Sequence, residues 1–155
     1  MKHVSYITDF EEWRKDFYFS IPIKVRFSET DAYAHLNNTK PFIYFEEVRL
    51  DYFRSLGFTE WENPTSDKGF VVADLQCDFI RQVFFNERLT VYIKLVSFGN
   101  SSVDLHYLIE NESEEPCIVG RGAVVQISKK DGTAVPWDGK IRKRFEEEIN
   151  KSKIT

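Results

Sequence analysis

Cysteine is scarce in this 155-residue chain, which has two, Cys77 and Cys117. Each lies in a strand-like run, and neither has a CxxC neighbour or a Cys/His companion at the spacing of metal ligands. Isolated cysteines of this kind usually behave as small buried apolar side chains. We therefore expect reduced, buried thiols, no metal site and no bound cofactor.

Positive charge is not in excess either. The chain has 21 Lys and Arg against 25 Asp and Glu, which gives a formal net charge of −4. Surfaces that bind nucleic acid neutralise phosphates with clustered cations, whereas the basic residues here are scattered, except in KIRKR at 140–144. The composition therefore argues against a nucleic-acid partner.

Long apolar runs are absent. No segment approaches the ~20 apolar residues that a membrane span requires. The N-terminal stretch MKHVSYITDFEEW has no apolar run of signal-peptide length. We expect a soluble, cytoplasmic protein with no membrane span.

Aromatic residues are abundant, with 14 Phe, seven Tyr and three Trp. They supply a large buried area per residue and would also suit an apolar ligand tunnel. The chain length falls in the usual range of one domain. We expect a single domain over 1–155, with an N-terminal extension at 1–19, a core at 20–130 and a tail at 131–155.

The strongest periodic pattern predicts a long helix after residue 40. Asn37 or Asn38 can cap this helix, and Pro41 falls in its first turn, where a missing N–H is tolerated. Gly57 ends it. Intervals of 100° place one broad apolar face on this helix, made of Phe42, Phe45, Val48, Tyr52, Phe53 and Leu56.

Two charged residues interrupt that face. Arg49 falls inside the apolar arc and Glu46 at its edge, three positions apart, so they are close enough to pair. The structural interpretation is a partly buried ion pair. The functional alternative is that one of the two reaches a partner subunit or a ligand.

Alternation of apolar and polar residues predicts strands at 21–27, 71–80, 89–98, 102–110 and 117–128. In the second run, one face holds Val71, Ala73, Leu75, Cys77 and Phe79. In the fourth, Asp104 and His106 fall on a polar, solvated face. Short amphipathic helices are predicted at 8–17 and 139–151.

The order is a strand, one long apolar helix, and then a series of long antiparallel strands. A helix with so wide an apolar face must be enclosed, and a single sheet curled around it does so. We therefore predict an α+β hotdog fold, in which a curved antiparallel sheet wraps a long central helix and short helices flank it at the termini.

The loop between the first strand and that helix reads ETDAYAHLNNT at 29–39. It places an Asp, a His and two Asn within eight residues, immediately before the most apolar helix. Asp and Asn are common in turns and helix caps, so a capped turn is one interpretation. A reaction site is the other.

The stretch VRFSETDAYAHLNNTKPFIYFEEVRLDYFRSLGF resembles the opening of the 4-hydroxybenzoyl-CoA thioesterase group of hotdog proteins. That group carries a strand, an Asp, a short loop that often reads Gly-His-x-Asn-Asn, and a helix with Glu-Glu-x-Arg. VVADLQCDFIRQVFFNERLTVYIKLVSFGNSSVDLHYLI is similar to the strands of the group. The resemblance spans about residues 20 to 130.

This resemblance implies hydrolysis of an acyl-CoA thioester, with Asp31 at the position of the catalytic carboxylate. It also implies a homodimer with sites between subunits, in some members paired into tetramers. The chain departs from the pattern at Ala34, where Gly commonly precedes the His, and at Val83, where Pro is common. Plant acyl-ACP thioesterases of this fold carry an Asn where this chain has Tyr33.

Thioester hydrolysis needs an activated water or a nucleophile, and donors for the oxyanion. Asp31 can serve as general base or attack directly to form a mixed anhydride. Backbone N–H groups near Asn38 at the helix start suit the thioester oxygen as it gains charge. His35 could orient water or hydrogen-bond the carboxylate, or it could stabilise the loop.

Coenzyme A brings phosphates, which proteins meet with Lys, Arg and exposed N–H groups. Arg81, Arg88 and the turn at 99–102 are candidates for these contacts. We expect substrate contacts from Asn37, Thr39, Glu46, Arg81, Ser101 and Ser102. An acyl carrier protein remains an alternative to CoA.

Two other functions stay open. Hotdog hydratases and dehydratases also use an Asp and a His about five residues apart, although their common signature has Asn-Pro before the His, where this chain has Tyr33-Ala34. A non-catalytic acyl-CoA-binding or scaffold dimer is the second alternative. Enoyl-CoA hydration and binding without product formation distinguish them from hydrolysis.

Overall fold

The structure, a computed structural model, describes the backbone of residues 2–154 and the side chains of residues 2–151. In chain order the elements are α1 (Phe10–Lys15), β1 (Phe19–Lys24), the 3₁₀ helix η1 (Phe27–Glu29), α2 (Pro41–Ser55), the 3₁₀ helix η2 (Glu60–Glu62), β2 (Lys68–Phe79), β3 (Arg88–Phe98), β4 (Ser102–Glu110), β5 (Pro116–Ser128) and α3 (Gly139–Ile154). The predicted helices and strands are therefore present, with bounds shifted by a few residues.

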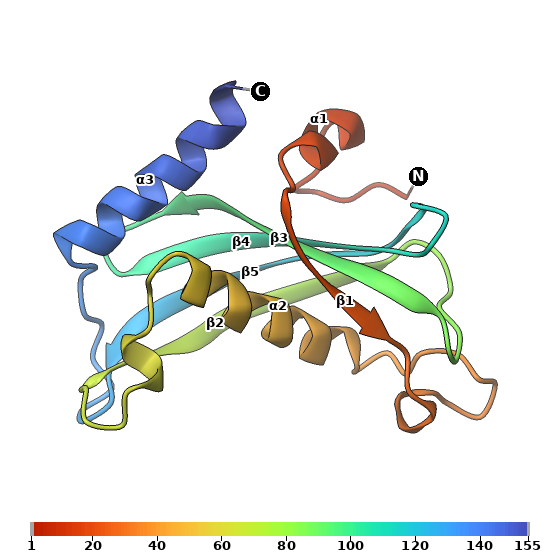
Figure 1. The fold of residues 1–155 in the computed structure, drawn as a ribbon, viewed down its shortest axis with the longest axis horizontal. Helices are drawn as coiled ribbons and strands as arrows, with labels where there is room; N and C mark the ends of the chain where they lie inside the picture. Colours follow the sequence, from red (N-terminus) through yellow and green to blue (C-terminus); the bar gives the residue numbers. More distant parts are fainter. Residues whose placement is uncertain (1, 155) are drawn as a thin grey trace.

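The five strands form one antiparallel sheet in the order β1-β3-β4-β5-β2. The sheet is curved, and α2 lies across its concave face (Figure 1). This arrangement confirms the predicted α+β architecture of a long helix enclosed by a bent sheet. The strands β1 and β2 form the two edges, so β2 has one unpaired side.

Helix α2 buries the aromatic face that its periodicity predicted. The ring of Phe45 stacks on Tyr107 of β4, with 4.3 Å between the ring centroids. Gly120 of β5 makes room for this stack, because a Cβ at that position would lie 2.5 Å from the Phe45 ring. Phe42 does not belong to the buried face, since it is 37% exposed in the first turn of α2.

The predicted ion pair between Glu46 and Arg49 is wrong. Glu46 is exposed, whereas Arg49 is buried and donates from Nη1 to the hydroxyl of Tyr107 at 3.1 Å. Within the described residues, no carboxylate lies within ion-pair distance of Arg49, and its Nε has no hydrogen-bond acceptor. The guanidinium thus turns toward the sheet and away from its neighbour along the helix.

Strand β2 carries a bulge that the alternation pattern did not reveal. Its register with β5 shifts between Val72 and Asp74, so the residues on either side of Ala73 change faces. Phe70 packs on the main core before the bulge, and Leu75 and Cys77 pack on it afterwards. The predicted common face therefore holds only beyond Ala73.

The N-terminal segment covers the convex face of the sheet, where α1 lies (Figure 1). A second apolar cluster forms there from Val4, Ile7, Trp13, Phe17, Leu108 and Val119. His106 is 6% exposed in this cluster, so the prediction that it is solvated is wrong. The strand pattern gave the correct face, and the N-terminal segment then covers that face.

Helix α3 buries the Phe145 ring in the main core, and the buried carboxylate of Glu148 also links the helix to the body. Glu148 accepts hydrogen bonds from the hydroxyls of Tyr18 and Tyr52, the latter at 2.7 Å. Arg144 and Lys151 pair with it at 3.0 and 2.8 Å. Among the described helices, none combines the length and the apolar character that crossing a membrane requires.

Candidate active site

The loop before α2 is closed by the Asp31 side chain. Its Oδ1 accepts hydrogen bonds from the backbone N–H groups of Tyr33, at 2.8 Å, and His35, at 3.2 Å. The backbone adds two bonds, from Asp31 N to His35 O at 2.8 Å and from Ala34 N to Asp31 O at 3.1 Å. Asp commonly closes turns in this manner. The carboxylate is therefore fixed through one oxygen, and no donor within the described residues contacts the other oxygen.

Ala34 adopts the left-handed conformation that Gly accepts freely, with φ at +62°. Gly is common at this position in the group that the sequence resembles, so the backbone path is kept although the residue differs. A left-handed Ala costs about 1 kcal/mol or more relative to its normal conformation. The closed turn around Asp31 offsets this cost.

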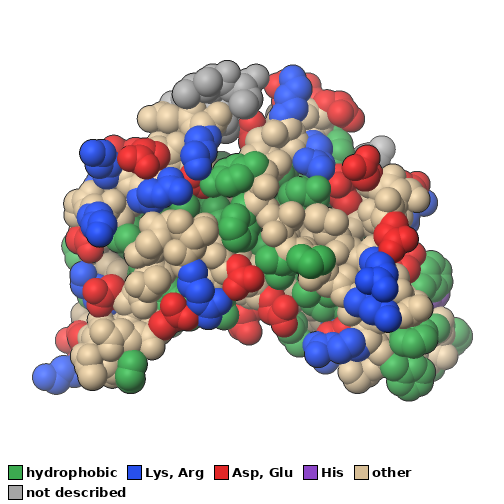
Figure 2. All heavy atoms as spheres, viewed as in Figure 1, with side chains coloured by type: hydrophobic (Ala, Val, Ile, Leu, Met, Phe, Trp, Pro, Cys, Tyr) green, Lys and Arg blue, Asp and Glu red, His purple; other side chains and the backbone are tan. Residues whose placement is uncertain are grey.

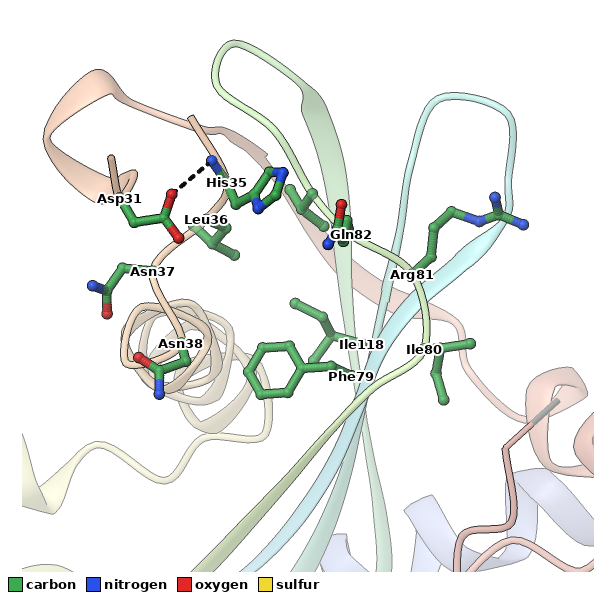
Figure 3. A pocket seen from close by; sticks show the side chains of 11 residues that line it. Asp31, His35, Leu36, Asn37, Asn38, Phe79, Ile80, Arg81, Gln82 and Ile118 are labelled. Carbon is green, nitrogen blue, oxygen red and sulfur yellow. Dashed lines mark hydrogen bonds between the residues drawn. The ribbon is translucent and has the colours of Figure 1, made fainter. Parts of the chain in front are cut away.

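A cavity of about 360 Å³ opens beside this loop. It is lined by Asp31, His35, Leu36, Asn37, Asn38, Phe79, Ile80, Arg81, Gln82, Val83 and Ile118. Figure 3 shows Asp31, Asn37 and Asn38 on one side and Arg81 and Gln82 on the other, with Phe79 and Ile118 between them. A carboxylate and a helix start thus face an apolar floor.

The start of α2 differs from its prediction, because neither Asn37 nor Asn38 is the N-cap. Lys40 takes that position, without a side-chain hydrogen bond. The Asn37 Oδ1 accepts from the N–H and hydroxyl of Thr39, at 3.0 and 2.7 Å. The reason is that residues 38–40 form a separate turn, which also bonds Lys40 N to Asn37 O at 3.0 Å.

This turn leaves backbone donors free near the cavity. Pro41 has no N–H, and within the part of the chain that the structure describes, the N–H groups of Asn38 and Phe42 have no acceptor. Free N–H groups at a helix start, with the positive end of its dipole, suit an oxygen that gains negative charge. Asn38 itself lines the cavity.

His35 contacts Asp31 through its backbone and not through its imidazole. The ring is half-buried and packs edge-on against Phe84, with 4.9 Å between the centroids. Its side chain nevertheless lines the same cavity. The structure therefore places the imidazole at the cavity and separates it from direct contact with the Asp31 carboxylate.

The remaining predicted substrate contacts lie in different places. Arg81 lines the cavity, is about half exposed, and pairs with Glu115 at 2.9 Å. Thr39 is exposed beside Asn37, and Glu46 is exposed further along α2. Ser101 and Ser102 lie at the β3–β4 turn, at the end of the sheet where Trp137 Nε1 bonds Ser102 O at 3.0 Å. One chain does not bring that turn to the cavity.

Several lining residues were not predicted. Gln82 lines the cavity opposite Asp31, and Ile80, Val83 and Ile118 provide apolar surface. Ile118 stands opposite Phe79 in the β2–β5 ladder, so the alternation of these two strands contained a signal for it. Gln82 falls between strands, where periodicity gives no direction.

Within the described residues, His, Cys, Asp and Glu side chains form no cluster that could hold a metal ion. Cys77 and Cys117 are free thiols; Cys117 is buried, as predicted, whereas Cys77 is only half-buried. Burial raises the pKa of the Cys77 thiol to about 12 and that of Cys117 to about 11. Neither thiol is therefore a ready nucleophile at neutral pH.

Known proteins match this chain over most of its length. The family described as the thioesterase-like superfamily matches residues 25–145. YsmA of Bacillus subtilis, an uncharacterized protein, is 48% identical over 138 residues, which cover 88% of this chain and 92% of YsmA. The long-chain acyl-CoA thioesterase FadM of Escherichia coli is 26% identical over 128 residues, which cover 82% of this chain and 96% of FadM.

A solved structure shows the same arrangement in space. A thioesterase from Thermus thermophilus, complexed with coenzyme A and zinc, superimposes with a TM-score of 0.73 at 25% identity. The match covers 87% of this chain and 95% of that structure. The chain belongs to the thioesterase-like superfamily, and its fold is the hotdog fold that the sequence predicted.

Proposed function

We propose that the protein hydrolyses an acyl-CoA thioester to free CoA and a carboxylic acid, with Asp31 as general base or nucleophile. The observation that supports this proposal is the state of the Asp31 carboxylate. Its Oδ1 is fixed by two N–H groups, while Oδ2 has no donor in the described part of the chain and lies beside a cavity at a helix start. FadM and the Thermus thioesterase, whose names specify acyl-CoA and coenzyme A, support the substrate class.

In the general-base route, Asp31 Oδ2 removes a proton from a water molecule as that water attacks the thioester carbon. In the nucleophilic route, Oδ2 attacks the carbon itself, and water then hydrolyses the mixed anhydride. Both routes break the C–S bond, and the CoA thiolate leaves and takes a proton. The fixed position of Oδ1 prepares Oδ2 for either step.

The thioester oxygen gains negative charge in both routes. We place it near the free N–H group of Asn38, which lines the cavity in the turn that leads into α2. One well-placed donor of this kind is typically worth about 10²–10³ in turnover. The acyl group would lie against the apolar floor formed by Phe79 and Ile118.

The CoA part of the bound substrate would extend out of the cavity past Arg81, which lies on the side opposite Asp31 (Figure 3).

Contacts from Glu46, Ser101 and Ser102 to the substrate would require a second chain, because none of the three lines the cavity of one chain. We propose a homodimer through the free edge of β2, where Val71, Val72 and Phe79 are 40–45% exposed. A cytoplasmic location would match the acyl-CoA substrate.

The test is release of free thiol from a panel of short, long and aromatic acyl-CoA esters. Asp31→Asn should lower turnover by about 10²–10⁴ while it keeps the acceptor oxygen for Tyr33 and His35. Asp51→Asn, an exposed carboxylate on α2, is the matched control and should have wild-type activity. Unchanged turnover in Asp31→Asn would remove Asp31 from the mechanism.

The same protein should be assayed for hydration of an enoyl-CoA and for tight binding of a non-hydrolysable acyl-CoA analogue. Hydration without thiol release would indicate a hydratase. Tight binding with neither product would indicate a non-catalytic acyl-CoA-binding protein. Either outcome would contradict the proposed hydrolysis.

A further inference from the structure

Four exposed aromatic side chains stand on the two loops beside the cavity. Tyr33 is 79% exposed and Phe27 is 76% exposed, and Phe84 and Phe85 are 43% and 46% exposed. We call this group the aromatic tip. Figure 2 shows hydrophobic side chains gathered at the lower right, where these loops lie in Figure 1. Large apolar side chains are rarely grouped on a protein surface without a binding role.

The aromatic tip is a rigid unit. Backbone bonds join the two loops, from Leu36 N to Val83 O at 2.7 Å and from Phe85 N to Ala34 O at 3.0 Å. The rings add contacts, with 5.6 Å between the centroids of Phe27 and Phe85. A rigid surface loses little conformational entropy when it binds. The rings are therefore held outward before any partner arrives.

We propose that the aromatic tip inserts into the interfacial layer of a phospholipid membrane. Tyr and Phe side chains are suited to this layer, where apolar and polar surroundings meet. With about 200 Å² for each aromatic side chain, the tip exposes roughly 500 Å². A stable protein interface buries about 800 Å² on each partner, so the tip is small for a second chain but sufficient for a membrane contact.

The charges around the aromatic tip indicate whether the membrane must contain anionic lipids. Arg26 pairs with Glu29 at 2.9 Å, Arg81 with Glu115 at 2.9 Å, and Arg88 lies 3.7 Å from Glu112. Since these cations already have carboxylate partners, they provide little attraction for anionic lipids. The contact should therefore be apolar and insensitive to salt, and it should not need anionic headgroups.

The aromatic tip lies next to the cavity, so membrane binding would affect which substrates reach the site; this inference rests on the proposed hydrolase function. The loops that carry the tip also supply His35, Gln82 and Val83 to the cavity. An enzyme docked by its tip would hold the cavity entrance against the membrane surface, where long-chain acyl-CoA esters gather as amphiphiles. The tip would thus favour membrane-held substrates over short, water-soluble ones.

The test is flotation of the full chain with phosphatidylcholine vesicles at low and high salt. Wild-type protein should float with the vesicles, with less than about a twofold change across the salt range. The double variant Phe27→Ser/Phe85→Ser should bind at least about tenfold more weakly. Val96→Ser removes another exposed apolar side chain, at the far end of β3, and should bind as wild type.

Neither Phe27 nor Phe85 lines the cavity, so the double variant should keep its activity toward a short acyl-CoA and lose it toward a vesicle-held long-chain ester. Wild-type protein that stays out of the lipid fraction would overturn the proposal. A double variant that floats normally would also overturn it, as would one that changes its oligomeric state instead of its lipid binding. Flotation needs no turnover, so these outcomes are independent of whether hydrolysis is found.

Discussion

Trp13 of α1 donates a hydrogen bond from its indole Nε1 to the Nδ1 of His106 on β4, at 2.8 Å. Ninety-three positions separate these residues in the chain. The bond fixes the N-terminal segment to the middle of the sheet and requires a neutral imidazole at Nδ1, because a protonated ring has no acceptor there. Stability and pH are thereby linked at this position.

The pKa of His106 should make folding sensitive to acid. Burial lowers this pKa to about 4, although the Asp104 carboxylate opposes the shift. An unfolded His has a pKa near 6.5, so the unfolded state binds the proton first and stability falls as pH drops from about 6.5 toward 4. We expect a loss of about 2 kcal/mol between pH 7 and pH 5, measured by urea unfolding. His106→Gln should remove most of this slope, and an equal slope in both proteins would contradict the link.

Trp13→Phe tests the same bond from its other end. The substitution keeps an aromatic ring beside Phe17 but leaves the buried Nδ1 of His106 without its donor. An unsatisfied buried acceptor costs about 1–3 kcal/mol. The unfolding midpoint should fall accordingly, whereas Phe10→Leu, at a half-buried position on the same helix, should have a smaller effect. Equal losses would show that ring packing alone holds the segment.

Ala34→Gly should stabilise the protein. The φ of +62° costs an Ala about 1 kcal/mol or more, and a Gly adopts it freely. Part of this gain is lost because Gly has more freedom in the unfolded chain, so we expect a net gain below about 1 kcal/mol. Ala32→Gly, two positions away without a positive φ, should destabilise slightly in the same thermal unfolding assay. A lower midpoint for Ala34→Gly would show that the turn needs the methyl group.

Gly120→Ala should destabilise the core. The added Cβ would lie 2.5 Å from the Phe45 ring and 2.8 Å from the backbone oxygen of Gln76. Forcing an extra methyl into a packed core costs about 1–3 kcal/mol. The double variant Gly120→Ala/Phe45→Leu should recover part of the loss relative to the two single variants, since only the ring contact is relieved. Strict additivity in this cycle would place the strain at Gln76 alone.

Periodic elements were predictable from the sequence, and their contacts were not. Strand alternation gave β2 to β5 to within a few residues, and the spacing of Phe45 to Phe53 gave the buried face of α2. The prediction went wrong wherever a partner lay far along the chain. Arg49 bonds Tyr107 instead of Glu46, and His106 is buried by Trp13. Distances along one helix or strand do not contain that information.

In the candidate site, too, some residues were predictable from the sequence and others were not. A carboxylate before an apolar helix could be recognised at Asp31, and the structure places Asn38 and Arg81 in the same cavity. The turn at 38–40, which makes Lys40 the N-cap, follows from local hydrogen bonds that several sequences could satisfy. Gln82 escaped prediction because it belongs to no periodic segment.

The N-terminal segment also determines which side chains the convex face of the sheet can carry. Leu108 and Val119 are apolar on the convex side of the sheet because Val4, Ile7 and Phe17 shield them from water. A relative that begins directly at the first strand would have to carry hydrophilic side chains at those two sites, or hide them against another molecule. Removal of the residues before the first strand, with Leu108 and Val119 unchanged, should expose these two side chains to water and make the protein aggregate.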